Sequence, residues 1–226
     1  MSRCPIYDIV VPTSGRDSLG RLLGSLSRGA DASAGRVIVV HDRDGRGPAA
    51  ARNAGWRDAA AEWVVFLDDD VVVPEGWREA LAEDLAGLPE HVAGSQGRIV
   101  VPLPRDRRPT DWERNVSGLE SARWATADMA YRRSALAAVG GFDERFPRAY
   151  REDADLGLRL VEAGYEIRRW RRRVHHPVRE ARPWVSLRLQ ACNADDALMR
   201  ALHGRDWRTR AGAPRGRLPR HVLTAA

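Results

Sequence analysis

The stretch WVVFLDDDVVVP, residues 63–74, carries the clearest information on both fold and chemistry. Trp63 to Leu67 form an apolar run with the length and β-branched content of a buried strand, and three aspartates follow at once. Adjacent carboxylates repel one another in a poorly solvated site, and a divalent cation removes that conflict. An acidic, solvated turn at a strand end explains the triplet alone equally well, so the surrounding residues have to decide.

On both sides of this stretch, short apolar runs alternate with segments of helical periodicity. Further strands are predicted at residues 6–11, 37–40, 127–131 and 165–170, and helices at 19–26, 48–61, 77–88, from 134, from 152 and over 184–198. This alternation is typical of an α/β domain with a mainly parallel central sheet flanked by helices. Ligands of such sheets bind outside the carboxyl ends of the strands, where Asp68 to Asp70 would lie. Residues 98–123 give no clear assignment.

Length and composition limit the class of protein. The 226 residues fit one domain, and 43% hydrophobic with 30% charged residues exclude wholesale disorder. No apolar run approaches the roughly 20 residues of a membrane-spanning helix, and the N-terminus lacks a signal-peptide pattern, so a cytoplasmic location is expected. Cys4 and Cys192 have neither metal-ligand spacing nor the numbers of a disulfide framework.

Positive charge is concentrated toward the C-terminus. All 37 basic residues are arginines, and residues 168–226 contain 15 of them against four carboxylates. Such a segment fits contact with an anionic membrane, binding of nucleic acid, or a solvated tail. Trp170 is the only aromatic residue in the run 168–173, which disfavours nucleic acid as a partner. We expect residues 168–182 and the tail to contact anionic lipid at the inner face of the cell membrane.

Several motifs, in the family's order, resemble the family-2 glycosyltransferases. GPAAARNAG at 47–55 and FLDDDVVVP at 66–74 resemble the nucleotide-sugar half, and ADMAYRR at 127–133, GGFDERF at 140–146 and REDADLGLRL at 151–160 resemble the acceptor half. The resemblance extends from about residue 5 to 177. It implies a Rossmann-like nucleotide-diphosphosugar transferase fold of the GT-A type. It also implies inverting transfer from a nucleotide-diphosphate sugar, expected to be a UDP-sugar, to a hydroxyl acceptor on a glycan or a lipid-linked cell-envelope molecule.

The resemblance also assigns donor-binding residues. Pro12, Thr13 and Arg16 would border the nucleoside, Asp42 would meet the base, and Arg52 would approach the base or the phosphates. Asp68 would bind the ribose, and Asp70 would bind a cation, Mn²⁺ or Mg²⁺, that bridges the phosphates, with Asp69 nearby. Because side chains alternate along an extended strand end, Asp68 and Asp70 are expected to project to the same side.

The acceptor side of the predicted site depends on the segment that begins at residue 151. The resemblance gives Asp153 the role of general base toward the acceptor hydroxyl, and Glu152 that of orienting the acceptor or the loop. The same acidic residues also fit the first turn of a helix, where they are stabilised by its macrodipole. His176, in preference to His175, is the candidate that completes the metal shell, and Trp124 and Asp128 are the acceptor-site candidates.

The resemblance predicts the domain boundaries, and it leaves alternatives for the residue that contacts the base and for the class of enzyme. A single domain over 1–210 would contain a nucleotide-sugar half at about 1–100, an acceptor half at about 101–180 and a helix at about 183–203, followed by a flexible basic tail at 211–226. The loop 43–47 is shorter than in relatives, so Asp44 could substitute for Asp42 at the base. A sugar nucleotidyltransferase of similar fold is the alternative, disfavoured because residues 12–17 contain Gly15 as their sole glycine.

Overall fold

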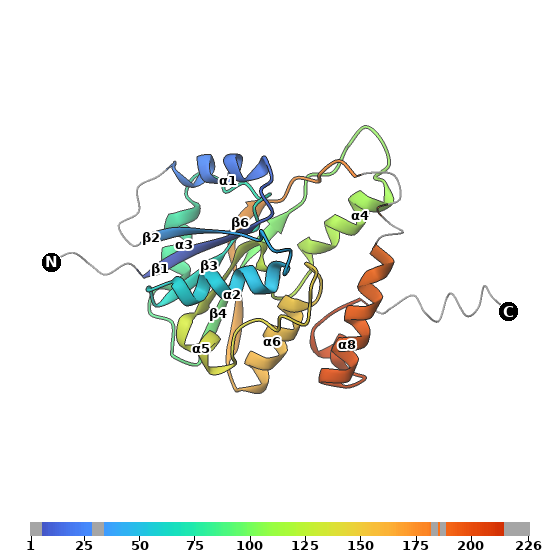
Figure 1. The fold of residues 1–226 in the computed structure, drawn as a ribbon. Coiled ribbons are helices and arrows are strands. Elements are labelled where there is room, and N and C mark those ends of the chain that lie inside the picture. The colour runs from blue at the N-terminus through green and yellow to red at the C-terminus, as the bar shows by residue number, and fades with distance from the viewer. Residues whose placement is uncertain (1–5, 29–33, 182–184, 186–188, 215–226) are drawn as a thin grey trace.

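The computed structural model describes residues 6–28, 34–181, 185 and 189–214. Its centre is a six-stranded sheet in the order β2-β1-β3-β5-β4-β6 (Figure 1). The strands are β1 Tyr7–Thr13, β2 Ala34–His41, β3 Trp63–Phe66, β4 Val92–Val100, β5 Met129–Arg132 and β6 Glu166–His175. Within this described sheet β5 alone runs antiparallel to its neighbours, so the predicted α/β fold with a mainly parallel sheet is confirmed.

Helices cover both faces of the sheet (Figure 1). α1 Ser18–Leu26 and α3 Trp77–Leu85 share one hydrophobic layer with the sheet, and α2 Pro48–Asp58, α5 Arg133–Ala138 and α6 Glu152–Glu162 share the other. Trp63 and Val65 of β3 enter the first layer, and Val64 and Phe66 the second, because successive side chains of a strand point to opposite faces. Burial on both faces explains why this strand is an uninterrupted apolar run.

Strand β4, Val92–Val100, was not among the strands predicted from sequence, and it extends into the segment 98–123 that gave no assignment. Its sequence, VAGSQGRIV, breaks the apolar pattern with two glycines and two polar residues that are all buried. Both glycines are required by close neighbours. A Cβ at Gly94 would lie 2.7 Å from Cγ2 of Ile167, and one at Gly97 would lie 1.9 Å from Oδ2 of Asp128. The strand is therefore specified by its tertiary neighbours, which local periodicity does not reveal.

The C-terminal part of the described chain packs against α6 (Figure 1). A 3-10 turn at Leu189–Cys192 leads into α8 Asn193–His203, and α9 Trp207–Arg210 follows. α8 coincides with the later part of the helix expected at 183–203. Residues 182–184 and 186–188 lie outside the described residues, as does Cys4. Ala211 is buried, which corrects the expected start of a flexible tail at 211; residues 215–226 lie outside the description.

One further helix, α4 Asp111–Ser117, begins with a capping box in which Thr110 and Glu113 exchange side-chain to backbone hydrogen bonds. None of the described helices is long and apolar enough to cross a membrane.

Candidate active site

Three side chains with metal-binding atoms meet at the carboxyl edge of the parallel strands. Asp68 and Asp70 follow β3, and His176 follows β6, whose terminal His175 forms a bridge with Val72. One ligand atom from each of Asp68, Asp70 and His176 lies within 4.8 Å of the others. The expectation that Asp68 and Asp70 project to the same place is therefore confirmed. Of the two adjacent histidines, His176 is buried and lies beside Asp70, at 3.3 Å, whereas His175 is exposed.

The chemistry of this cluster fits a divalent cation. Oδ1 of Asp70 and Nδ1 of His176 are buried and have no hydrogen-bond partner among the described residues. Burial raises the pKa of Asp70, and the charge of Asp68 acts in the same direction. Two carboxylates and an imidazole suit Mn²⁺ or Mg²⁺, and a bound cation would satisfy the unpaired atoms. Arg179, whose guanidinium is about half exposed, adds an ion pair of 2.9 Å to Oδ2 of Asp70.

Asp69 points away from this cluster and fixes the end of β1. It accepts hydrogen bonds from Oγ1 of Thr13 at 2.6 Å and from Nη1 of Arg16 at 2.8 Å. Thr13 is buried and its hydroxyl is engaged with Asp69, whereas the guanidinium of Arg16 is 42% exposed and also lies 3.7 Å from Asp70. Pro12 is buried in the sheet. Arg16 is thus the member of the predicted nucleoside-bordering group that presents charge at the site.

The short loop after β2 is closed by Asp42. Its two carboxylate oxygens accept hydrogen bonds from the backbone N–H groups of Arg46, at 2.8 Å, and Gly47, at 2.9 Å. Gly47 has a φ of 90°, and a Cβ there would lie 2.4 Å from the carbonyl oxygen of Pro147, so glycine is required before Pro48 starts α2. Asp42 therefore fixes the backbone of this loop, and Asp44 beside it is exposed.

Arg52 connects the two halves of the site. Its guanidinium, 3% exposed, donates to Oδ1 of Asp68 at 2.9 Å and to Oε1 of Glu152 at 2.8 Å. Asp68 and Glu152 are separated by more than 80 residues, and the buried guanidinium of Arg52 lies between their two carboxyl groups. Arg52 is thus committed to two carboxylates, in contrast to the expected direct contact with the base or phosphates.

The acidic pair at the start of α6 faces this same edge. Glu152 is 2% exposed, and burial raises its pKa to about 8 against the opposing charge of Arg52. Asp153 is half-buried; its Oδ1 accepts the N–H of Ala154 at 2.7 Å, and its second oxygen has no donor among the described residues. Burial also raises the pKa of Asp153, and the charge of Asp68 adds to that effect. A carboxylate with a free oxygen and a raised pKa is suited to accept a proton.

The sequence from residue 9 to 155 matches the family model described as Glycosyl transferase family 2. The chain belongs to this family. A Pre-mycofactocin glycosyltransferase from Mycobacterium tuberculosis is 34% identical over an alignment of 145 positions, and the match covers 58% of this chain and 30% of that protein. The present family-2 chain therefore aligns with less than a third of the length of that relative.

Solved structures share the fold of this family-2 chain. A structure of S. aureus TarS 1-349 has a TM-score of 0.57 at 13% identity and covers 76% of this chain and 60% of its own. The mannosyltransferase PcManGT from Pyrobaculum calidifontis, in complex with GDP-Man and Mn²⁺, has a TM-score of 0.55 at 19% identity and covers 87% of this chain and 65% of its own. At these identities the likeness concerns the fold, and it agrees with the expected GT-A type.

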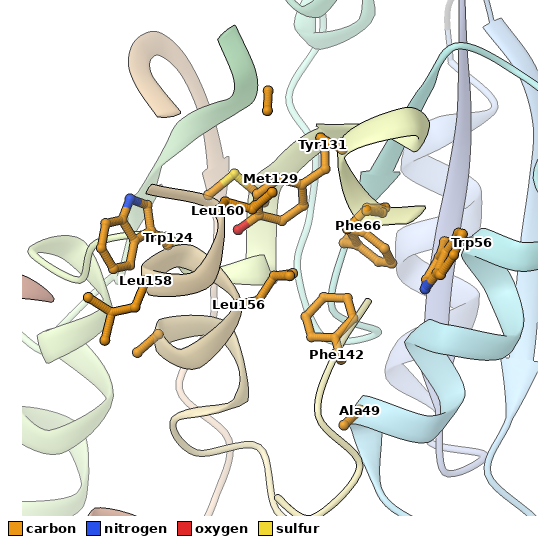
Figure 2. Close-up of a cluster of buried hydrophobic side chains, with 14 of the residues drawn as sticks. Ala49, Trp56, Phe66, Trp124, Met129, Tyr131, Phe142, Leu156, Leu158 and Leu160 are labelled. Carbon is orange, nitrogen blue, oxygen red and sulfur yellow. The ribbon is translucent and has the colours of Figure 1, made fainter. Parts of the chain in front are cut away.

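Both acceptor-site candidates lie in the interior, in contrast to the expectation from sequence. Trp124 is 4% exposed and packs its ring on α6, where a Cβ at Gly157 would lie 2.2 Å from Cε3 of the indole (Figure 2). Asp128 is fully buried, pairs with Arg172 at 3.0 Å and accepts from Nε1 of Trp77 at 3.2 Å. Neither residue offers a free surface to an acceptor.

Asn53 has a positioning role that the sequence did not indicate. Its Oδ1 accepts from the Phe142 N–H and from Nε1 of Trp56, and its Nδ2 donates to the Phe142 carbonyl, each at 2.9 Å. The ring of Phe142 in turn lies 5.6 Å from the guanidinium carbon of Arg52. The motif around Arg52 signals that Asn53 belongs to the site, but its partner is 89 residues away and is visible only in the fold.

Proposed function

We propose that this chain transfers a sugar, with inversion, from a nucleotide-diphosphate sugar to a hydroxyl acceptor. The observation that carries the proposal is the cluster of Asp68, Asp70 and His176, whose ligand atoms lie within 4.8 Å at the edge where such sheets bind ligands. Arg16 and Arg179 place two partly exposed positive charges beside it. This combination suits a diphosphate, because a cation and guanidinium groups neutralise phosphate oxygens.

The donor side is proposed to work through the predicted residues. Asp70 and His176 would hold the cation, and Asp68 would lie between the cation and the ribose. When bound, Mn²⁺ or Mg²⁺ supplies charge stabilisation for the departing diphosphate. Pro12, Thr13 and Asp42 would form the wall of the nucleoside pocket, with Asp69 holding Thr13 and Arg16 in place. We propose UDP as the nucleotide; a TarS structure in complex with UDP-GlcNAc has this fold.

The acceptor side is proposed to work through Asp153. Its free carboxylate oxygen would take the proton of the acceptor hydroxyl. At the same time the hydroxyl oxygen of the acceptor would bond to the anomeric carbon, and the bond from that carbon to the diphosphate would break. Attack from the face opposite the leaving group gives inversion. Glu152 is fixed by Arg52 and would orient the loop, which leaves the proton transfer to its neighbour.

The test is stabilisation by donor analogue and cation. Mn²⁺ with UDP is expected to add RT ln(1 + [L]/Kd) to the free energy of unfolding of the wild type and so to raise its melting temperature, and Asp70→Asn is expected to lose that shift. Asp106→Asn, which changes an exposed aspartate away from the cluster, is the matched control and should retain it. No Mn²⁺-dependent shift with UDP, GDP or their sugars would refute the donor proposal. Pyrophosphate release from a nucleoside triphosphate and a sugar phosphate would favour the nucleotidyltransferase instead.

For the acceptor, we propose a glycan or lipid-linked molecule presented at an anionic membrane surface. Arg98 and Arg173 are partners across β4 and β6, and together with Arg171 they are exposed and have no carboxylate partner among the described residues. Like charges on neighbouring strands destabilise a sheet unless an anion compensates them. Arg172, in contrast, is fully buried and pairs with Asp84 and Asp128, so part of the arginine run has a structural role.

A further inference from the structure

The two C-terminal helices hold the loop that leads into α6. Asp195 and Asp196, in the first turn of α8, pair with two arginines of that loop. Nη1 of Arg148 lies 3.0 Å from Oδ1 of Asp195, and Nε of Arg151 lies 2.8 Å from Oδ1 of Asp196. Arg208 of α9 donates to the other oxygen of Asp196 at 2.6 Å. Asp196 thus joins three elements: the loop, α8 and α9.

Arg151 needs such support because its backbone is strained. Its φ of 77° lies in the left-handed region, which a residue with a Cβ rarely adopts. It is the residue directly before Glu152 and Asp153, so its backbone angles set the direction in which α6 begins. The first hydrogen bond of the helix, from the Asp155 N–H to the Arg151 carbonyl, is 2.8 Å long.

One local and two distant residues contact the Arg151 side chain. Its guanidinium carbon lies 4.2 Å from the ring centre of Tyr150 and 4.9 Å from that of Trp207, which is fully buried in α9. Nη2 donates to the Tyr150 hydroxyl at 2.6 Å. Asp196 supplies the countercharge to this stacked guanidinium. The distant contacts to Arg151 therefore come from Asp196 of α8 and Trp207 of α9.

We propose that Asp196 is a positioning residue for Asp153, acting through Arg151. This inference rests on the proposed role of Asp153 as the base. Glu152 is fixed from the donor side by Arg52, and the loop before it is fixed from the C-terminal side by Asp196. The segment that supplies Asp196 lies beyond the residues 9–155 that match the family model.

The opposite end of α6 offers a matched control. Glu162, the last residue of that helix, pairs with Arg210 of α9 and lies 3.6 Å from Nδ1 of His203 of α8. It joins the same helices as Asp196 does, but ten residues along α6, about 15 Å from the acidic pair at 1.5 Å per residue. Loss of this carboxylate would weaken the docking of α8 and α9 without touching Arg151.

The experiment compares Asp196→Asn with Glu162→Gln. The readouts are Mn²⁺-dependent hydrolysis of UDP-glucose, UDP-N-acetylglucosamine and GDP-mannose, and hydrogen exchange of a peptide spanning 150–156. Asp196→Asn is expected to lower kcat by about 10- to 100-fold with little change in the donor KM, because a misplaced base impairs chemistry more than binding. It should also speed exchange of the Asp155 amide. Asp196→Glu, which restores the charge, should recover part of kcat.

Glu162→Gln is expected to keep kcat within about twofold of the wild type and to leave exchange of 150–156 unchanged. Equal kcat values and equal exchange in the two variants would overturn the positioning role. If the wild type hydrolyses none of the three sugars, the proposed function fails, and the exchange comparison alone then decides whether Asp196 holds the loop.

Discussion

The protonation of Glu152 depends on burial and on contacts with residues that are distant in sequence. It is buried at the start of α6, one oxygen bonded to Arg52 and the other, Oε2, without a partner among the described residues. The charged groups that face it are Arg52 and Asp153, which act in opposite directions on its pKa. Burial has the largest effect, so the folded state favours the protonated carboxyl.

This leads to a pH-dependent difference in stability. Because burial raises the pKa of Glu152 to about 8 in the folded state, from an ordinary value of 4.5, the folded protein holds a proton that the unfolded chain has lost between these values. Wild-type stability should therefore fall relative to Glu152→Gln as pH rises from about 5 to about 8. At roughly 2–4 °C per kcal/mol, the difference should be visible in melting curves.

Glu162→Gln, on the exposed end of the same helix, is the control for this measurement and should show a smaller change across that range. A melting-temperature difference between the wild type and Glu152→Gln that stays constant from pH 5 to 8 would contradict the raised pKa of Glu152 in the folded state.

At the scale of elements, the position of α6 depends on a glycine. Gly157 lies one turn after Asp153, and the ring of Trp124 fills the space where its side chain would be (Figure 2). Trp124 itself has a left-handed φ of 66°, so the backbone before β5 adopts a strained conformation at the residue that makes this contact. The packing of the Trp124 ring against the backbone of Gly157 therefore fixes the position of α6, which carries the acidic pair.

Gly157→Ala is expected to destabilise the protein by about 1–3 kcal/mol, because an added methyl would overpack this contact. Gly24→Ala in α1 is the matched control: nothing lies within 4 Å of its Cβ position, so the better helix former should stabilise by up to about 1 kcal/mol. Urea unfolding measures both. A stabilised Gly157→Ala variant would mean that α6 is free to shift away from Trp124.

At the scale of the whole molecule, the formal net charge of +6 is unevenly placed, and the arginine-rich edge strand β6 ends at the candidate metal site. The proposed membrane contact therefore predicts that binding to vesicles depends on anionic lipid and falls with salt. The double variant Arg171→Glu/Arg173→Glu should lose most of its co-sedimentation with vesicles containing phosphatidylglycerol.

Arg21→Glu/Arg28→Glu is the control for that experiment, since it changes net charge equally at exposed positions on and just after α1. Equal loss in both double variants would show a response to overall charge alone. Co-sedimentation that is indifferent to anionic lipid would remove the membrane contact from the proposal.

The sequence by itself determined the features that depend on neighbours along the chain. The buried strand before Asp68, the alternation of the other strands and helices apart from β4 and α4, and the projection of Asp68 and Asp70 to one side follow from local patterns. The motif order was sufficient to identify the family, which the match over residues 9–155 shows.

Only the tertiary structure decided which side chains are engaged with one another. Arg52 meets Glu152 across 100 residues, Thr13 meets Asp69 across 56, and Arg151 meets Asp196 across 45. Tertiary packing also buries Trp124 and Asp128, so neither side chain is exposed to an acceptor. A side chain's exposure and its partners depend on the packing of distant segments, and the spacing of residues along the chain does not encode that packing in any local pattern.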